Sequence, residues 1–96
     1  MSEAFETALR AVREKVDASG LEGSYKFEIE GEGSIMVENG TVSAGDGEAD
    51  VTIRATLDTF RELFEGELDP TSAFMSGRIG IDGDMSAAMK LAQMVG

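Results

Sequence analysis

Between residues 24 and 55 the hydrophobic side chains recur at every second position, and this period of two constrains the fold more than any other feature. Tyr25, Phe27 and Ile29 alternate with charged residues, which is typical of a strand that buries one face and exposes the other. Short glycine-containing segments interrupt the alternation, and Asn39-Gly40 is the strongest hairpin signal among them because both residues accept positive φ. The pattern predicts four successive strands, near 24–30, 35–37, 41–44 and 49–55, arranged as an antiparallel meander.

The residues before this region follow a helical period instead. An apolar stripe with spacings of three and four predicts a helix that Ser2 caps and that Gly20 ends. The stripe consists of Phe5, Ala8, Leu9, Val12 and Val16. Glu3 and Glu6 stand in the first turn, where carboxylates favour the helix dipole. We therefore expect an amphipathic first helix.

Helical spacing returns after the fourth strand. Residues 57–64 predict a second helix, which Thr56 or Asp58 caps. Asp69-Pro70 predicts the start of a short third helix, since proline suits the first helical position, and Gly77 ends it.

One more strand and one more helix complete the pattern. Ile79 and Ile81 share one face of a strand over 78–82, and apolar residues recur at helical spacing from Met85 to about Val95. The order helix, four strands, two helices, strand, helix indicates an α+β fold. A chain of 96 residues holds one such domain, which we place at 1–96.

Composition excludes several classes of function. Eight basic and nineteen acidic residues give a net charge of −11, so nucleic acids and anionic membrane surfaces would repel the chain. Without cysteine or histidine there are no disulfides, no thiolate nucleophiles and no imidazole bases or metal ligands. No apolar run is long enough for a membrane span, and no secretory signal precedes the first helix. We expect a soluble cytoplasmic protein.

The polar motifs do not form a catalytic or metal site. The serines lack an activating base, and nothing in the pattern distinguishes one pair among the nineteen carboxylates. An EF-hand loop starting at Asp46 would need glycine and a carboxylate where Val51 and Leu57 stand. The segment 31–33 lacks the third glycine of a dinucleotide-binding motif, because Met36 occupies that position. We expect no catalytic residue, metal or cofactor, and an enzyme that uses carboxylates alone is the least favoured reading.

The chain has six methionines, and Met75, Met85, Met89 and Met94 lie in its last quarter. Methionine adapts to apolar ligands of varied shape, but it also fills small cores. The last helix carries more apolar surface than one stripe requires. A lid over a ligand, a protein interface and a fully covered helix all stay open at this point.

Several segments together resemble the sterol carrier protein 2 (SCP-2) sterol transfer family. Residues 66–78, GELDPTSAFMSGR, are similar to its characteristic motif, in which a proline and Ala-Phe precede a glycine and a basic residue. Residues 79–85 and 88–91 resemble its last strand and last helix, and 39–40 and 49–53 resemble its central strands. The length suggests a short, stand-alone member of the prokaryotic type.

The resemblance implies a five-stranded, mostly antiparallel sheet covered by helices, with an apolar tunnel between sheet and helices that takes a lipid. The implied function is non-catalytic binding, and transfer, of a fatty acid, acyl-CoA, phospholipid, isoprenoid or sterol-like molecule. The implied lining residues are Phe27, Ile35, Phe60, Leu63, Phe64, Phe74, Met75, Ile79, Ile81, Met85 and Met89. The alternative is an accessory domain that uses its methionine-rich end as a protein–protein or self-association interface.

Physical limits shape these expectations. A void of about 300 Å³ would cost about 7 kcal/mol, so we expect the pocket to be small, collapsed onto its methionines, or occupied by lipid. The charge of −11 argues against stable membrane insertion and leaves only transient membrane contact open. The basic cluster of Arg10, Arg13 and Lys15 is interrupted by Glu14 and Asp17, and we interpret it as a solvated helix face.

Overall fold

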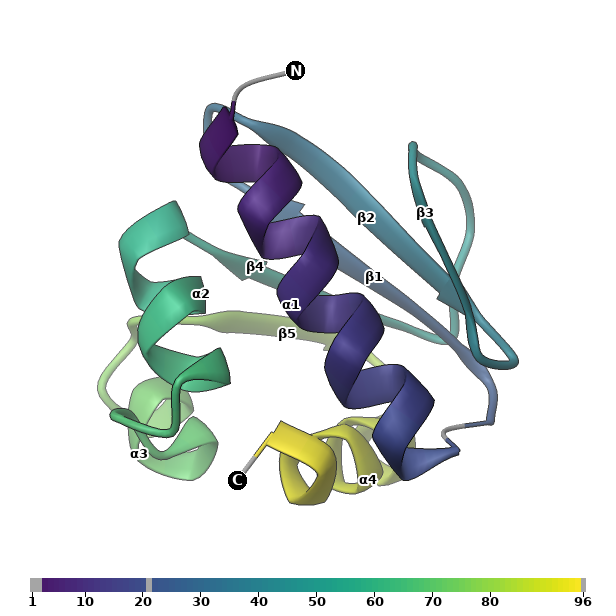
Figure 1. Cartoon of the computed structure of the whole chain (residues 1–96). Coiled ribbons are helices and arrows are strands. Elements are labelled where there is room, and N and C mark those ends of the chain that lie inside the picture. The colour runs from purple at the N-terminus through teal and green to yellow at the C-terminus, as the bar shows by residue number, and fades with distance from the viewer. Residues whose placement is uncertain (1–2, 21, 96) are drawn as a thin grey trace.

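In the described part of the chain, four helices cover one face of a five-stranded sheet (Figure 1). The computed structural model describes residues 3–20 and 22–95, and it confirms the predicted order of elements. These elements are α1 (Glu3–Ser19), β1 (Ser24–Ile29), β2 (Gly33–Glu38), β3 (Thr41–Ala44), β4 (Val51–Ala55), α2 (Leu57–Phe64), α3 (Pro70–Met75), β5 (Gly80–Gly83) and α4 (Met85–Val95).

The predicted meander is wrong in its last step. The strand order is β3-β2-β1-β4-β5, and β4 lies parallel to β1 instead of antiparallel beside β3. The other three pairings are antiparallel. Alternation identifies strands but not their neighbours, and contacts distant in sequence decide the placement: the Asp50 N–H lies 3.1 Å from the Ser24 carbonyl oxygen and 2.9 Å from the Ser24 hydroxyl. These bonds align the start of β4 with the start of β1.

The inward face of the sheet is apolar and the outward face is charged. Phe27 in the central strand pairs with Ile35 on one side and Ile53 on the other, and all three side chains are buried. On the outward face Arg54 forms ion pairs with Glu28 at 3.5 Å and with a β5 carboxylate at 4.0 Å. This outward face matches the predicted alternation. Met36 is an exception, because it points outward yet is buried.

The loop after β3 accounts for the burial of Met36. A Cβ placed on Gly47 would stand 3.7 Å from the end of the Met36 side chain, so this loop packs against the methionine. Lys26 Nζ also donates to the Asp46 carboxylate of the same loop at 2.9 Å. That hydrogen bond raises the pKa of Lys26 and lowers the pKa of Asp46. The loop thus covers part of the sheet face that carries no helix.

Two predicted helix caps are confirmed. The Thr56 hydroxyl accepts a hydrogen bond from the Thr59 N–H at 3.2 Å, so Thr56 and not Asp58 caps α2. The Asp69 carboxylate accepts from the Ser72 N–H at 3.0 Å and caps α3. The proposed cap of α1, Ser2, lies outside the described residues.

Replacing Asp69 with alanine should lower the free energy of unfolding by about 1 kcal/mol, because a donor at the start of α3 loses its acceptor. Equilibrium unfolding in urea measures the change. Asp69→Asn keeps an acceptor oxygen and should stay close to the parent chain. Equal losses in the two variants would show that the carboxylate does not act as a cap.

Candidate functional site

Three phenylalanine rings form the centre of the space between sheet and helices. Phe27 extends from the central strand, and Phe60 and Phe64 lie one turn apart on α2. The ring centroids of Phe27 lie 5.2 Å from Phe60 and 5.8 Å from Phe64, both edge-on, and the two α2 rings stack at 4.6 Å. The rings pack as a cluster that joins the middle of the sheet to α2.

A small apolar cavity, partly open to solvent and called the inner cavity below, lies on one side of this cluster, between the sheet and α2, α3 and α4. Its volume is about 30 Å³, far too small for a lipid chain. Its lining residues are Phe27, Ile53, Phe60, Leu63, Phe64, Pro70, Ile79, Ile81, Ala88, Leu91 and Ala92. None of these carries an ionisable group, so hydrophobicity and shape alone govern what this cavity accepts.

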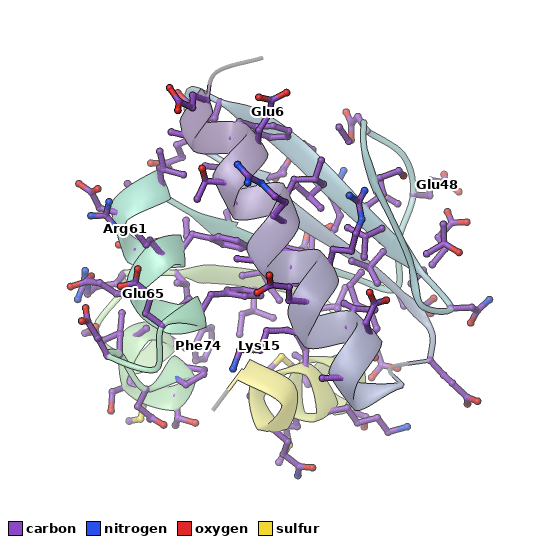
Figure 2. The ribbon with its side chains drawn as sticks, in the orientation of Figure 1. Glu6, Lys15, Glu48, Arg61, Glu65 and Phe74 are labelled. Atoms are coloured by element: carbon purple, nitrogen blue, oxygen red, sulfur yellow. The ribbon has the colours of Figure 1, made fainter. Side chains whose placement is uncertain are left out.

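A larger groove lies on the other side of the cluster, between α1 and α2. It has a volume of about 260 Å³, and its lining residues are Ala4, Thr7, Ala8, Ala11, Leu57, Phe60, Arg61, Phe64 and Glu65. Phe60 and Phe64 belong to both linings, so their two rings separate the groove from the inner cavity. Figure 2 shows Arg61 and Glu65 on the outer side of α2, at the rim of this arrangement.

Six of the eleven residues predicted to line a ligand site come together around the inner cavity. They are Phe27, Phe60, Leu63, Phe64, Ile79 and Ile81. Ile35 is fully buried beside Phe27 but lines neither the cavity nor the groove.

The other four predicted residues are exposed. The exposed fractions are 42% for Phe74, 81% for Met75, 50% for Met85 and 65% for Met89, and none of the four lines the cavity or the groove. The helix α3 has only six residues and buries one of them, Ala73, so the two residues after Ala73 face outward. The pocket beside the rings is small, and phenylalanine side chains, not methionines, occupy the space around it. The predicted ligand tunnel stays a prediction. The Met94 side chain lies outside the described part of the chain.

The predictions from sequence missed the groove and part of the cavity wall. The alanines at positions 4, 8 and 11 recur at helical spacing, and small residues on one helix face are the signal that a neighbouring helix leaves room there. The missed cavity residues Ile53, Ala88 and Leu91 read equally well as ordinary core positions, so no local signal distinguishes them.

Polar contacts of Arg78 connect α2 with the segment that precedes β5. Arg78 donates to the hydroxyl of Thr59 at 3.3 Å and pairs with the carboxylate of Glu62. Arg78 follows α3, and both partners lie on α2, so these contacts tie α2 to the connection between α3 and β5.

At the far end of the sheet face, burial raises the pKa of the Tyr25 phenol, which donates to the Glu22 carbonyl at 3.0 Å.

The described residues offer neither a metal site nor a membrane span. Over residues 3–20 and 22–95, no group of three carboxylate, cysteine or histidine side chains is arranged to hold a metal ion. No helix within the same ranges is both long enough and apolar enough to cross a bilayer.

Comparison with known proteins adds a family and a fold. The sequence pattern of the SCP-2 sterol transfer family matches residues 5–96. A curated relative, hydroxysteroid dehydrogenase-like protein 2 of Danio rerio, is 38% identical over 103 residues, which cover 99% of this chain and 25% of the relative. The chain therefore spans about a quarter of the length of the curated relatives it matches.

Two solved structures share the fold at low sequence identity. Sterol carrier protein 2 like 2 of Aedes aegypti is 24% identical with a TM-score of 0.82, and the match covers 94% of each chain. Sterol carrier protein 2 of the same organism, in complex with the C16 fatty acid palmitate, is 18% identical with a TM-score of 0.80 over 99% of this chain and 96% of that one. Both have a sheet and helices arranged as they are in this chain.

Proposed function

The chain belongs to the SCP-2 sterol transfer family, and on that premise we propose that it binds a hydrophobic ligand between its sheet and its helices, without catalysing a reaction. The ligand class is a lipid with a long apolar chain. The observation that carries the proposal is the pair of Phe60 and Phe64 rings, which stand between an inner cavity of about 30 Å³ and a groove of about 260 Å³.

The apolar lining explains how such a site would hold a lipid. Each methylene removed from water contributes about 0.8 kcal/mol, so a long chain gains ample free energy without polar contacts. The structure in complex with palmitate is of a protein with this fold, which supports an acyl chain as one occupant. Ligand sites commonly have volumes of about 300–1,000 Å³, so the groove is close to that range and the inner cavity is far below it.

Binding therefore requires the phenylalanine cluster to move or the groove to take most of the chain. Rotation of Phe60 and Phe64 away from Phe27 would join the two spaces into one. Leu63, Ile79 and Ile81 would then form the inner wall. We assign the ligand contacts to these residues first, and to Phe74, Met75, Met85 and Met89 only where a ligand emerges between α3 and α4.

A second candidate function is supported by the exposed apolar side chains of α3 and α4. Phe74, Met75, Met85 and Met89 leave large hydrophobic surface uncovered on two helices that contact each other. Such surface suits a protein partner or a second copy of the chain. Light scattering at increasing concentration separates the two functions, since a ligand carrier stays monomeric and a self-associating domain grows in mass.

Native mass spectrometry of the purified protein, followed by organic extraction, tests the proposed function directly. We expect a bound species whose mass corresponds to a lipid with an acyl or isoprenoid chain. The delipidated protein should then take up the uncharged fluorescent probe N-phenyl-1-naphthylamine, and added 1-dodecanol should displace it. A chain that carries no lipid and takes up no probe would contradict the proposal.

A further inference from the structure

We propose that the groove between α1 and α2 takes the chain of a fatty acid and that Lys15 binds its carboxylate at the end of the groove. This inference rests on the proposed function and specifies its ligand. It depends on three observations: the position of Lys15 on α1, the absence of a partner for Lys15 where most other basic side chains have one, and the chemistry of the groove walls.

Lys15 lies on the face of α1 that lines the groove. Residues three and four apart share one face of a helix, and Ala4, Ala8, Ala11 and Lys15 follow one another at spacings of four, three and four. The alanines all line the groove, and Lys15 stands one turn beyond Ala11, about 6 Å further along the axis. Figure 2 shows the Lys15 side chain leaving α1 on the side of α2 and α4, away from β3.

Lys15 also differs from the other basic residues of the chain. Five of the eight have a partner: Lys26, Arg54, Arg61 and Arg78 form ion pairs, and Arg13 donates to the Val42 carbonyl at 3.2 Å. Within the described ranges Arg10, Lys15 and Lys90 form neither an ion pair nor a side-chain hydrogen bond. Arg10 and Lys90 are exposed, whereas Lys15 is half-buried. Among the described residues, Lys15 is therefore the one half-buried basic residue that no anion of the chain pairs with, and its ammonium group is available to a ligand.

The groove walls suit an unbranched apolar chain. The alanines of α1 are small, so they leave the groove open, and Leu57, Phe60 and Phe64 form its apolar floor on α2. Lys15 lies beyond the lining, and the cation within the lining, Arg61, already pairs with Asp58 at 3.3 Å. In a chain with a net charge of −11, a free ammonium group at the end of an apolar groove attracts a single anionic head group. A carboxylate joined to an alkyl chain matches both features.

The test compares a charged ligand with an uncharged one of the same chain length. Dodecanoate and 1-dodecanol each displace N-phenyl-1-naphthylamine from the full chain, from Lys15→Met and from the control Lys90→Met. Lys15→Met keeps the length and apolar character of the side chain but removes the charge. We expect it to weaken dodecanoate binding about tenfold, the effect of losing one charge-assisted hydrogen bond, while dodecanol binding changes less than about twofold. Lys90→Met should leave both affinities unchanged.

A second variant tests the groove itself. Ala11→Phe fills the space between the helices and should weaken both ligands at least about tenfold, whereas Ala11→Ser keeps the groove open and should change neither. Circular dichroism and urea unfolding establish that each variant is folded before binding is compared.

The outcomes separate this inference from the proposed function. If the parent chain binds neither dodecanol nor dodecanoate, the proposed function fails and the inference with it. If both bind but Lys15→Met leaves dodecanoate unaffected, lipid binding stands and the role of Lys15 is overturned. If Ala11→Phe is folded and still binds both, the ligand lies elsewhere in the fold. Loss of dodecanoate binding alone in Lys15→Met, at low but not at high salt, supports the inference.

Discussion

Replacing Gly83 with alanine is expected to lower the free energy of unfolding by roughly 3–5 kcal/mol, because left-handed backbone and steric overlap add together. The φ of Gly83 is +111°, which side chains rarely adopt, and an added Cβ would stand 2.3 Å from the Asp50 carbonyl oxygen and 3.1 Å from the Val51 Cα. That oxygen cannot move away freely, since it accepts the Asp84 N–H at 2.9 Å. Both partners of the clash are backbone, so no side-chain rotation relieves it.

Two other glycines separate the causes of this loss. Gly77 has a φ of +81° with nothing within 4 Å of an added Cβ, so Gly77→Ala should show the backbone penalty alone, about 1–2 kcal/mol. A Cβ on Gly47 meets only the end of the Met36 side chain at 3.7 Å, so Gly47→Ala should be close to neutral. Urea unfolding of the three variants should rank Gly83, Gly77 and Gly47 in that order. Equal losses of unfolding free energy at Gly83 and Gly77 would mean that the steric overlap adds nothing, because β5 can move away from β4 at no cost in free energy.

The elements of this fold could be predicted because their signals are local. Alternation around Phe27 identifies a strand, and Asn39-Gly40, with φ of +47° and +88°, forms the hairpin that its chemistry demands. Asp69-Pro70 starts a helix for reasons contained in two residues. Each of these features depends on neighbours along the chain, and the structure confirms each.

The arrangement of the elements depends on contacts that the sequence does not display. The parallel pairing of β1 and β4 is stabilised by bonds between Ser24 and Asp50, which stand 26 residues apart. The candidate site likewise depends partly on local signals and partly on contacts between residues distant in sequence. The family resemblance implied that Phe60 and Phe64 line it, and both residues lie on the buried face of α2. The resemblance also implied that Met75, Met85 and Met89 contact the ligand, and the spacing of residues along the chain does not show that α3 and α4 leave these side chains exposed. The groove was missed because it exists only where α1 and α2 meet.

Replacing Phe60 with alanine should produce the other large effect, and one that connects stability with binding. Phe60 is 2% exposed, and its removal should lower the free energy of unfolding by roughly 3–5 kcal/mol, a large part of the 5–15 kcal/mol of a typical domain. Because the ring lines both spaces, its loss should join the groove and the inner cavity into one apolar site. A ligand that fills this site then replaces the missing ring.

The matched control is Phe5→Ala. Phe5 is 1% exposed and lines neither the cavity nor the groove. Its ring packs beside Gly33, where an added Cβ would stand 3.2 Å from it. Both variants should lose similar stability, but 1-dodecanol should restore it only in Phe60→Ala. A ligand at a hundredfold excess over its dissociation constant contributes about 2.7 kcal/mol, which urea unfolding resolves. Equal stabilisation of both variants would show that the ligand acts outside the phenylalanine cluster. Selective rescue of Phe60→Ala would mean that the ring occupies, in the free protein, the space a lipid chain takes when bound.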